Sequence, residues 1–178
     1  MKKAAFLDRD GVINRKAPEG EYILRWEEFQ FLPGVAEAIK LLNNSGILVI
    51  VVSNQRCVSK GLLSIPDLEE IHRKMQDVLS VAGARLDAIY FCPHDNFPPC
   101  DCRKPAPGML LSAAKEHGID LSASWMIGDT NSDMEAGKRA GCKTIKILPQ
   151  ATIESSSADE SADSLLSAVH HLLRNSPL

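Results

Sequence analysis

The sequence predicts an α/β fold in which helices cover both faces of a doubly wound, mostly parallel β-sheet. Short apolar, β-branched runs alternate with segments of helical period along most of the chain, which is the pattern of such folds. The run ILVIVV at 47–52 is continuously apolar, as a strand buried on both faces is. The 178 residues suit one compact domain with a full core, and no internal repeat is present.

The expected elements follow one another at short intervals. The segment 33–46 is typical of the helices, because Val35, Ile39 and Leu42 recur at helical spacing and Gly46 ends the pattern. Strands are expected at 4–8, 47–52, 88–91, 124–129 and 143–148. Helices are expected at 33–46, 64–82, 108–118, 133–141 and about 164–174. Residues from about 153 to 163 are rich in Ser, Asp and Glu, and we expect them to form an exposed linker.

Composition and charge exclude several classes of function. The net charge of −3 does not favour nucleic acid or an anionic membrane as a partner. No apolar run approaches the roughly 20 residues that span a bilayer, and the start MKKAAFLDRDG does not resemble a signal peptide. We therefore expect a cytoplasmic protein whose five cysteines are reduced. A monomer is the default expectation.

Polar residues stand where the expected strands end. Asp8 and Asp10 end the first strand, Ser53 follows the second, and Asp129 follows the fourth. Because ligands bind beyond the carboxyl ends of the strands in such sheets, these groups are expected on one rim. Several carboxylates on an open rim suit Mg²⁺. One carboxylate can attack phosphorus and a second can act as general acid and base, while Ser53 and Lys104 hold the phosphoryl group.

Four short motifs occur in a fixed order, and together they resemble the motifs of the haloacid dehalogenase (HAD) superfamily of phosphatases. They are DRDG at 8–11, SNQ at 53–55, RKP at 103–105 and GDTNSD at 128–133. The resemblance implies a Rossmann-like HAD fold with Asp8 as nucleophile and Asp10 as acid/base. It also implies Mg²⁺ held by Asp8, the backbone carbonyl of Asp10, and Asp129. Whether Asp133 contacts the metal or only stabilises a helix N-terminus stays open.

The loop CPHDNFPPCDC at 92–102 predicts a second metal site. It offers Cys92, His94, Cys100 and Cys102 in a C-x-H-x₅-C-x-C array. Three thiolates and one imidazole complete a closed tetrahedral set for structural Zn²⁺. Since the loop runs straight into Arg103 and Lys104, we expect the zinc to hold that part of the chain against the substrate. Cys57 and Cys142 stand apart from this array, and their role is left open.

The motifs together with the cysteine loop narrow the resemblance. FLDRDGVIN, FLPGV, SNQ, the cysteine loop and RKPAPGML resemble the bacterial D-glycero-D-manno-heptose 1,7-bisphosphate 7-phosphatases, whose substrate is a small phosphorylated sugar used for lipopolysaccharide or S-layer precursors. Histidinol-phosphate phosphatase domains share nearly the same motifs. The resemblance implies substrate contacts from Arg9, Lys16, Glu19, Asn54, Gln55, Arg56, Arg103 and Thr130. Arg103 and Arg56 are expected to pair with a second phosphate, although Arg56 can equally be an ordinary loop residue.

The spacing of the motifs leaves no room for a large cap. About 42 residues separate the first two motifs, and one helix and one strand fill them. Substrate specificity must then come from loops such as 15–27 and 54–62. The chain departs from the heptose enzymes in this region, with Arg56-Cys57-Val58 after Gln55 and with Thr130 where a lysine is frequent.

Three functions remain to be compared. The leading one is a Mg²⁺-dependent phosphatase acting on the 7-phosphate of heptose 1,7-bisphosphate. Its rivals are a phosphatase for histidinol phosphate or another small sugar phosphate, and a zinc-stabilised binding module without catalysis. The intact pair of Asp8 and Asp10 disfavours the binding module. A phosphomutase is disfavoured because it needs a cap to exclude water. The sequence does not indicate the anomer at C1.

Overall fold

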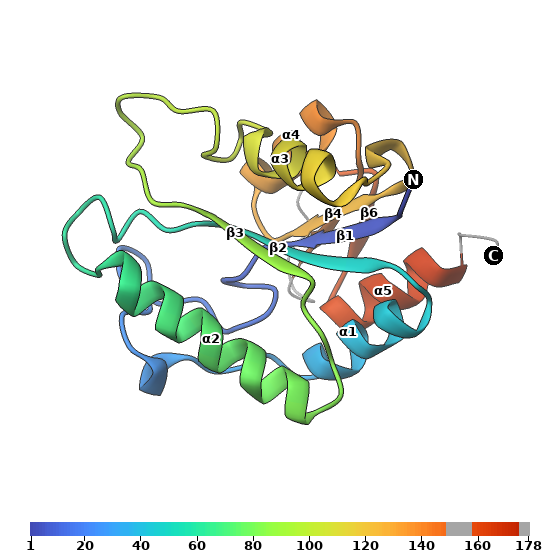
Figure 1. The fold of residues 1–178 in the computed structure, drawn as a ribbon, viewed down its shortest axis with the longest axis horizontal. Helices are drawn as coiled ribbons and strands as arrows, with labels where there is room; N and C mark the ends of the chain where they lie inside the picture. The colour runs from blue at the N-terminus through green and yellow to red at the C-terminus, as the bar shows by residue number, and fades with distance from the viewer. Residues whose placement is uncertain (149–157, 175–178) are drawn as a thin grey trace.

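The sheet has six parallel strands in the order β3-β2-β1-β4-β5-β6, in a computed structural model that describes residues 1–148 and 158–174 (Figure 1). The strands are β1 (Ala4–Leu7), β2 (Leu48–Asn54), β3 (Ala88–Cys92), β4 (Trp125–Gly128), β5 (Lys143–Ile147) and β6 (Glu160–Ala162). The strand order reverses between β1 and β4, which are parallel neighbours: the chain adds β2 and β3 on one side of them and β5 and β6 on the other. This reversal is the point at which such sheets bind ligands. The predicted doubly wound α/β fold is confirmed.

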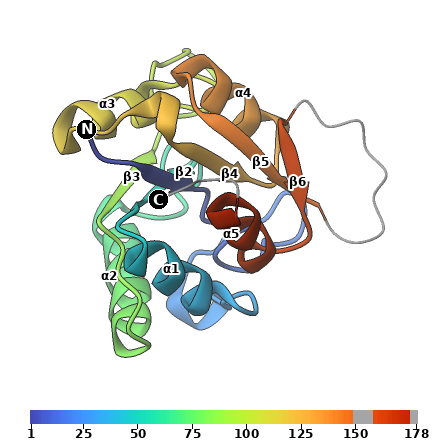
Figure 2. The ribbon, with the colours of Figure 1, turned by 90° about the vertical axis from the view of Figure 1, so that its right-hand side faces the viewer.

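Helices cover both faces of the sheet, as Figures 1 and 2 show. They are α1 (Val35–Asn44), α2 (Ile65–Val81), α3 (Gly108–His117), α4 (Asn131–Ala140) and α5 (Leu165–Arg174). One face carries α1, α2 and α5, and the other carries α3 and α4. Each face has its own cluster of buried apolar side chains against the sheet. The molecule is therefore a three-layer sandwich with a central sheet.

Strand β1 lies at the centre of the sheet and is fully buried. Leu7 is in register with Val51 of β2 on one side and with Ile127 of β4 on the other, and its exposed fraction is 0%. This register fixes the height at which the chain leaves β1. The polar residues after β1, β2 and β4 consequently emerge side by side.

The expected elements agree with the observed ones except near two ends. Helix α4 begins at Asn131, two residues earlier than expected, because Thr130 and Asp133 form a capping box around its first turn. The expectation of an exposed linker at 153–163 is wrong for Glu160–Ala162, which form strand β6 beside β5. Asp159 supports this pairing, since its carboxylate accepts hydrogen bonds from the backbone N–H and the hydroxyl of Thr144, both at 2.8 Å. Residues 153–157 lie outside the described residues.

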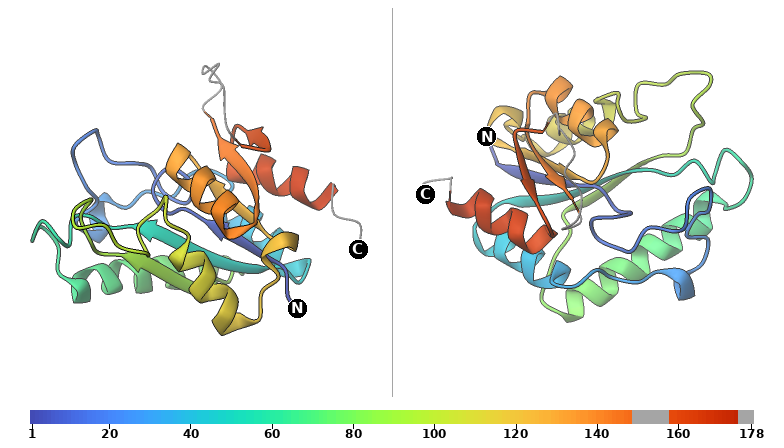
Figure 3. Two further views of the ribbon diagram at one scale, coloured as in Figure 1. Left: turned by 90° about the horizontal axis from the view of Figure 1, so that it is seen from above. Right: turned by 180° about the vertical axis from the view of Figure 1, so that it is seen from behind.

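The segment between β1 and α1 occupies the space beside the strand ends without forming a cap domain among the described residues. Its only regular element there is a 3₁₀ turn at Trp26–Glu28, which stacks Trp26 on Phe29 with ring centroids 5.1 Å apart. The loops after β1, β2 and β3 extend from the same end of the sheet (Figures 1 and 3). No helix in the described part of the chain is long and apolar enough to cross a membrane.

Candidate active site

Three carboxylates and one ammonium group meet at the carboxyl end of the central strands. One carboxylate oxygen each from Asp8, Asp129 and Asp133 lies within 4.8 Å of the others. The Lys104 Nζ lies 2.9 Å from Asp8 Oδ1 and 2.6 Å from Asp133 Oδ1, and it donates a third bond of 2.8 Å to the Val52 carbonyl. Lys104 is therefore fixed between two acids at the floor of the site, where it is 4% exposed.

Asp129 offers an oxygen that the described protein groups do not satisfy. Its Oδ1 is buried without a hydrogen-bond partner in the described part of the chain, while Oδ2 lies 2.5 Å from the Nζ of the half-exposed Lys16. Gly11, with φ +93°, lets the chain turn directly over this carboxylate, and a Cβ there would lie 2.4 Å from Asp129 Oδ2. An unpaired buried carboxylate oxygen is costly, so this donor set fits a hard divalent cation.

Asp133 is held by both neighbouring elements. Its Oδ2 accepts hydrogen bonds from the backbone N–H of Thr130 at 3.0 Å and from the Thr130 hydroxyl at 2.6 Å. Its Oδ1 pairs with Lys104. One oxygen of Asp133 therefore caps α4 while the other pairs with Lys104, and whether Asp133 also contacts a metal ion stays a prediction.

Burial and neighbouring charges shift the pKa values of the groups in this cluster. Burial raises the pKa of Asp8 to about 7, against the pull of Lys104 and with the help of Asp133, Asp129 and Asp10. Burial likewise raises the pKa of Asp129, although Lys16 opposes it. Burial disfavours the charge on Lys104, but Asp133 and Asp8 outweigh it and raise the Lys104 pKa. A divalent cation at the carboxylates favours their charged forms.

Asp10 lies in a separate hydrogen-bond network beside this cluster. Its carboxylate accepts bonds from Arg9 Nε and Arg9 Nη2, both at 3.1 Å. Asn14 Nδ2 donates to it at 2.9 Å, and Gln55 Nε2 donates at 3.1 Å. Burial opposes its charge, yet Arg9 and these donors hold the pKa of Asp10 below its ordinary value. The carboxylate is therefore ionised and its two oxygens are filled by four donors.

The predicted residues at the carboxyl end of β2 contact other parts of the site. Gln55 Nε2 bridges Asp10 to the Ser53 hydroxyl, which it reaches at 2.7 Å. Asn54 binds the backbone of Lys104 twice, with its Nδ2 donating to the carbonyl at 3.1 Å and its Oδ1 accepting from the N–H at 3.0 Å. Ser53 and Gln55 are buried, at 1% and 3% exposure. Asn54 and Gln55 thus fix the positions of Lys104 and Asp10.

Two adjoining cavities open above these residues. The smaller, of about 160 Å³, is lined by Asp8, Asp10, Lys16, Ser53, Asn54, Lys104, Thr130, Ser132 and Asp133. The larger, of about 450 Å³, is lined by Arg9, Asp10, residues 16–23, Asn54 and Gln55. Three residues, Asp10, Lys16 and Asn54, line both. A small polar cavity lined by five charged side chains therefore adjoins a larger one whose walls are both polar and apolar.

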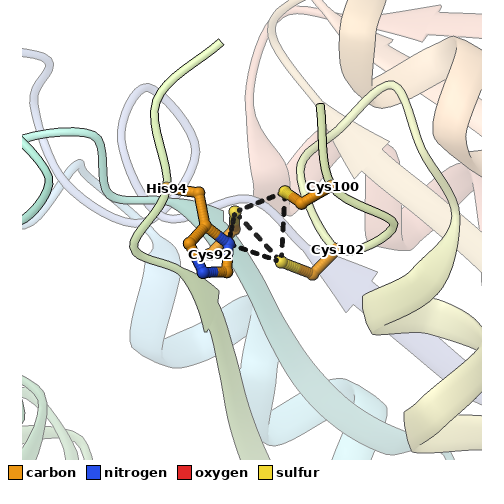
Figure 4. A group of neighbouring side chains, drawn as sticks. All are labelled: Cys92, His94, Cys100 and Cys102. Carbon is orange, nitrogen blue, oxygen red and sulfur yellow. Dashed lines mark hydrogen bonds between the residues drawn. The ribbon is translucent and has the colours of Figure 1, made fainter. Parts of the chain in front are cut away.

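Figure 4 shows the four side chains of the cysteine loop pointing toward one another. The Sγ atoms of Cys92, Cys100 and Cys102 lie 3.1–3.6 Å apart. His94 Nδ1 lies 3.5 Å from the Cys92 sulfur and 3.3 Å from the Cys102 sulfur. Ligands around tetrahedral zinc, with Zn–S bonds of about 2.3 Å, lie about 3.8 Å apart. The four groups, which the sequence identified, form a cluster that could hold a metal ion.

The two arginines expected to reach a second phosphate are tied to the cysteine loop. Arg56 Nε lies 2.5 Å from Asp95 Oδ1. Arg103 Nε donates to Asn96 Oδ1 at 2.8 Å, and its Nη1 donates to the His94 carbonyl at 3.2 Å. Neither arginine lines the two cavities, so a contact with a second phosphate stays a prediction for both.

The remaining expected substrate contacts differ in accessibility. Glu19 is exposed on the wall of the larger cavity, and Thr130 lines the smaller one. Arg9 reaches the larger cavity but is 1% exposed, and Asp10 already occupies two of its nitrogens. The structure shows Arg9 in contact with Asp10. A direct contact between Arg9 and substrate stays a prediction.

Sequence reasoning missed two residues of this network. Asn14 is fully buried and donates to Asp10. His72 on α2 is 5% exposed, and its Nε2 lies 3.2 Å from Arg9 Nη1. The helical spacing of α2 indicates only an ordinary buried position for His72. Two features of the sequence could have indicated this contact. His72 lies among the apolar residues of the buried helix face, and Arg9 stands between Asp8 and Asp10.

Comparisons with known proteins agree with this fold and site. Residues 101–168 match the model of the HAD-hydrolase-like family. A D-glycero-beta-D-manno-heptose-1,7-bisphosphate 7-phosphatase of Rhodopseudomonas palustris is 44% identical over 147 residues, which cover 79% of this chain and 80% of that protein. A D-glycero-alpha-D-manno-heptose-1,7-bisphosphate 7-phosphatase of Mycobacterium bovis is 39% identical, covering 90% of this chain and 86% of that protein.

A solved structure resembles the whole chain. The crystal structure of D,D-heptose 1,7-bisphosphate phosphatase from B. bronchiseptica, complexed with magnesium and phosphate, has a TM-score of 0.86 and 30% identity. The match covers 98% of this chain and 99% of that one. Fold and site thus define a phosphoric monoester hydrolase of the HAD type. The chain belongs to the heptose-1,7-bisphosphate 7-phosphatase family of these enzymes.

Proposed function

We propose that this enzyme removes the 7-phosphate of D-glycero-D-manno-heptose 1,7-bisphosphate through an aspartyl-phosphate on Asp8. The observation that carries this proposal is the pairing of two cavities. Asp8, Asp133 and Lys104 line the smaller one, which adjoins a cavity of about 450 Å³. That volume lies within the range of about 300–1,000 Å³ typical of small-ligand sites.

Asp8 and Asp129 are the residues that would hold Mg²⁺, with the Asp10 backbone carbonyl as a further ligand. The unpaired buried Oδ1 of Asp129 supports this assignment, as does the close approach of three carboxylates. When bound, Mg²⁺ supplies positive charge to the phosphoryl oxygens and favours the ionised form of Asp8. Asp133 remains with Lys104 and with the first turn of α4.

The side chains of the smaller cavity divide the work of phosphoryl transfer. The Asp8 carboxylate attacks phosphorus as the nucleophile. Lys104, held between Asp8 and Asp133, presents its charge to the phosphoryl oxygens, and the Ser53 hydroxyl donates to another of them. Asn54 contributes by fixing the Lys104 backbone on both its polar groups.

Asp10 serves as general acid toward the departing sugar oxygen and then as base toward water. Its filled hydrogen-bond set matches the base form, because all four donors favour the carboxylate. To act as acid, Asp10 must take up a proton from the solvent in the open cavities and release at least one donor. We infer that substrate entry brings about this exchange at the boundary of the two cavities, where Asp10 lies.

The larger cavity would bind the sugar. Its wall between residues 16 and 23 combines Lys16 and Glu19 with the apolar Pro18, Tyr22 and Ile23. Acidic and amide groups can accept and donate to sugar hydroxyls, while Lys16 can pair with a phosphate. Arg103, which follows the cysteine loop, and Arg56, which pairs with Asp95 of that loop, are proposed to reach the phosphate at C1.

The cysteine cluster is proposed to hold structural Zn²⁺. Four protein ligands close a tetrahedral site, and the loop then continues directly into Arg103 and Lys104. The zinc would therefore order residues whose fixation otherwise costs about 1–2 kcal/mol each. Thiolate ligation suits a reducing compartment, so we also propose a cytoplasmic location. Because one chain supplies both cavities, we propose that a monomer is sufficient for activity.

A phosphate-release assay on purified enzyme with Mg²⁺ tests the substrate. It compares both anomers of heptose 1,7-bisphosphate with histidinol phosphate and with simple sugar monophosphates, and it uses the Asp8→Asn variant as the blank. We expect kcat/KM to favour one heptose bisphosphate by more than about 100-fold, which corresponds to about 2.7 kcal/mol. A flat profile, or a preference for histidinol phosphate, would refute the substrate assignment.

A further inference from the structure

His72 belongs to a helix that contributes no residue to the predicted chemistry, yet it touches the acid/base network. It lies on α2, on the helix face turned toward the sheet, and is 5% exposed. Its Nε2 lies 3.2 Å from Arg9 Nη1. The ring also packs against Phe91 of β3, with centroids 5.7 Å apart. Two contacts therefore fix the ring.

The chemistry of the pair defines the state of the imidazole. A guanidinium group donates hydrogen bonds and cannot accept them. His72 must therefore accept at Nε2, which places its proton on Nδ1 and leaves the ring neutral. Burial and the charge of Arg9 lower the pKa of His72 to about 3, which agrees with a neutral ring.

Arg9 connects this imidazole to Asp10. It is 1% exposed, so water does not satisfy its nitrogens. Nε and Nη2 bind the Asp10 carboxylate in a two-point contact, and Nη1 binds His72. Because the five donors of a guanidinium form a rigid plane, fixing Nη1 also fixes the direction of the two nitrogens that hold Asp10.

The other contacts of Asp10 do not replace this arrangement. Asn14 and Gln55 donate one bond each, whereas Arg9 supplies two bonds and the charge. A buried guanidinium that lost its acceptor at Nη1 would turn toward another acceptor, since leaving a charged donor unpaired is costly. That movement would shift the Asp10 carboxylate from the boundary of the cavities.

We propose that His72 is a positioning residue, which acts through Arg9 to orient the Asp10 carboxyl for proton transfer. The proposal rests on the function proposed above, in which Asp10 is the general acid and base. It assigns to α2 a role in the reaction, at a residue that touches neither metal, phosphate nor sugar.

Two variants separate the acceptor from the packing of the ring. His72→Gln keeps an oxygen that can accept from Arg9, whereas His72→Phe keeps the ring volume without an acceptor. Each is assayed with heptose 1,7-bisphosphate, whose leaving alkoxide needs a proton, and with p-nitrophenyl phosphate, whose leaving phenolate does not. The quantity compared is kcat/KM, because it reports the step that forms the phospho-enzyme.

His72→Phe should lose about 10-fold to 100-fold in kcat/KM on the sugar phosphate, within the range of general acid catalysis. On p-nitrophenyl phosphate it should stay within about 3-fold of wild type, and His72→Gln should stay within about 3-fold on both substrates. An equal loss on both substrates, or no loss on either, overturns the proposal. The proposal is also overturned if His72→Gln folds stably but loses activity on the sugar phosphate and not on p-nitrophenyl phosphate. This second outcome keeps the test decisive if His72→Phe does not fold.

Failure of the proposed function gives a different result. In that case the wild-type enzyme itself does not release phosphate from the heptose bisphosphate, or Asp10→Asn does not reduce its rate. When the wild type releases phosphate and Asp10→Asn reduces the rate, the proposed function holds. The relative kcat/KM of the His72 variants on the two substrates then tests the role of His72 alone.

Discussion

Lowering the pH from 7 to 5 should destabilise the protein through His72. The folded state keeps this imidazole neutral, because burial and Arg9 lower its pKa from 6.5 to about 3. Well above pH 6.5 the ring is neutral in both the folded and the unfolded state, so it does not change the free energy of unfolding. Between pH 6.5 and pH 3 the unfolded chain binds a proton that the folded chain does not, so the free energy of unfolding falls as the pH falls.

The size of the effect follows from the two pKa values. Between pH 7 and pH 5, the unfolded imidazole changes from mostly neutral to mostly charged, while the folded one stays neutral. Integration over this interval gives a loss of about 2 kcal/mol. The ring is 5% exposed, so solvent screening reduces the value little.

Urea unfolding at pH 7 and pH 5 measures this loss in the wild type and in His72→Gln. The wild type should lose about 2 kcal/mol more than the variant over the interval. Comparing the two proteins removes contributions from carboxylates and cysteine ligands, which both contain. His170→Gln, at an exposed position of α5, is the matched control and should follow the wild type. Equal losses in wild type and His72→Gln would refute the argument from burial.

Three further predictions concern the two metal sites and the nucleophile. Asp8→Asn should reduce phosphate release at least about 1,000-fold while fold and zinc content persist, as circular dichroism and metal analysis can show; turnover near wild type would remove Asp8 from its role. Removing zinc with a chelator, followed by dialysis into Mg²⁺, should raise KM or abolish activity, because the loop that carries Lys104 loses its support; full activity of zinc-free enzyme would contradict this. Gly11→Ala should weaken Mg²⁺ binding in calorimetry and reduce kcat at least about 10-fold, since its Cβ would lie 2.4 Å from Asp129 Oδ2. Gly46→Ala is the control, because Gly46 also has a positive φ, has no atom within 4 Å of the added carbon, and lines neither cavity. An equal effect of both substitutions would attribute the loss to backbone strain of about 1 kcal/mol.

The sequence predicted the groups that stand at strand ends. Asp8, Ser53 and Asp129 each follow a short apolar run, and parallel strands bring such positions together whatever the rest of the chain does. The sequence also predicted the cysteine cluster, because three cysteines and one histidine between Cys92 and Cys102 have the spacing of metal ligands in a single loop. In these cases local pattern and global fold agree.

The parts that the sequence did not predict depend on contacts between distant segments. The interaction between His72 and Arg9 joins residues 63 positions apart, and neither helical spacing nor a motif encodes it. Strand β6 has no apolar alternation, and it forms because β5 offers an edge and Asp159 binds Thr144. Asn54 and Gln55 were expected to touch substrate, and only the folded chain turns them toward Lys104 and Asp10.

The wall of the larger cavity between residues 16 and 23 is attached to the rest of the molecule near its two ends, where Lys16 pairs with Asp129 and Ile23 joins the buried core, while residues 18–21 are exposed. At its start Arg15 donates its backbone N–H to the Gln30 carbonyl at 2.8 Å, and near its end the Lys60 ammonium lies 5.3 Å from the centre of the Tyr22 ring. The groups that perform phosphoryl transfer come from other segments, apart from Lys16. The exposed middle of this stretch can therefore change in sequence without moving the groups that perform phosphoryl transfer.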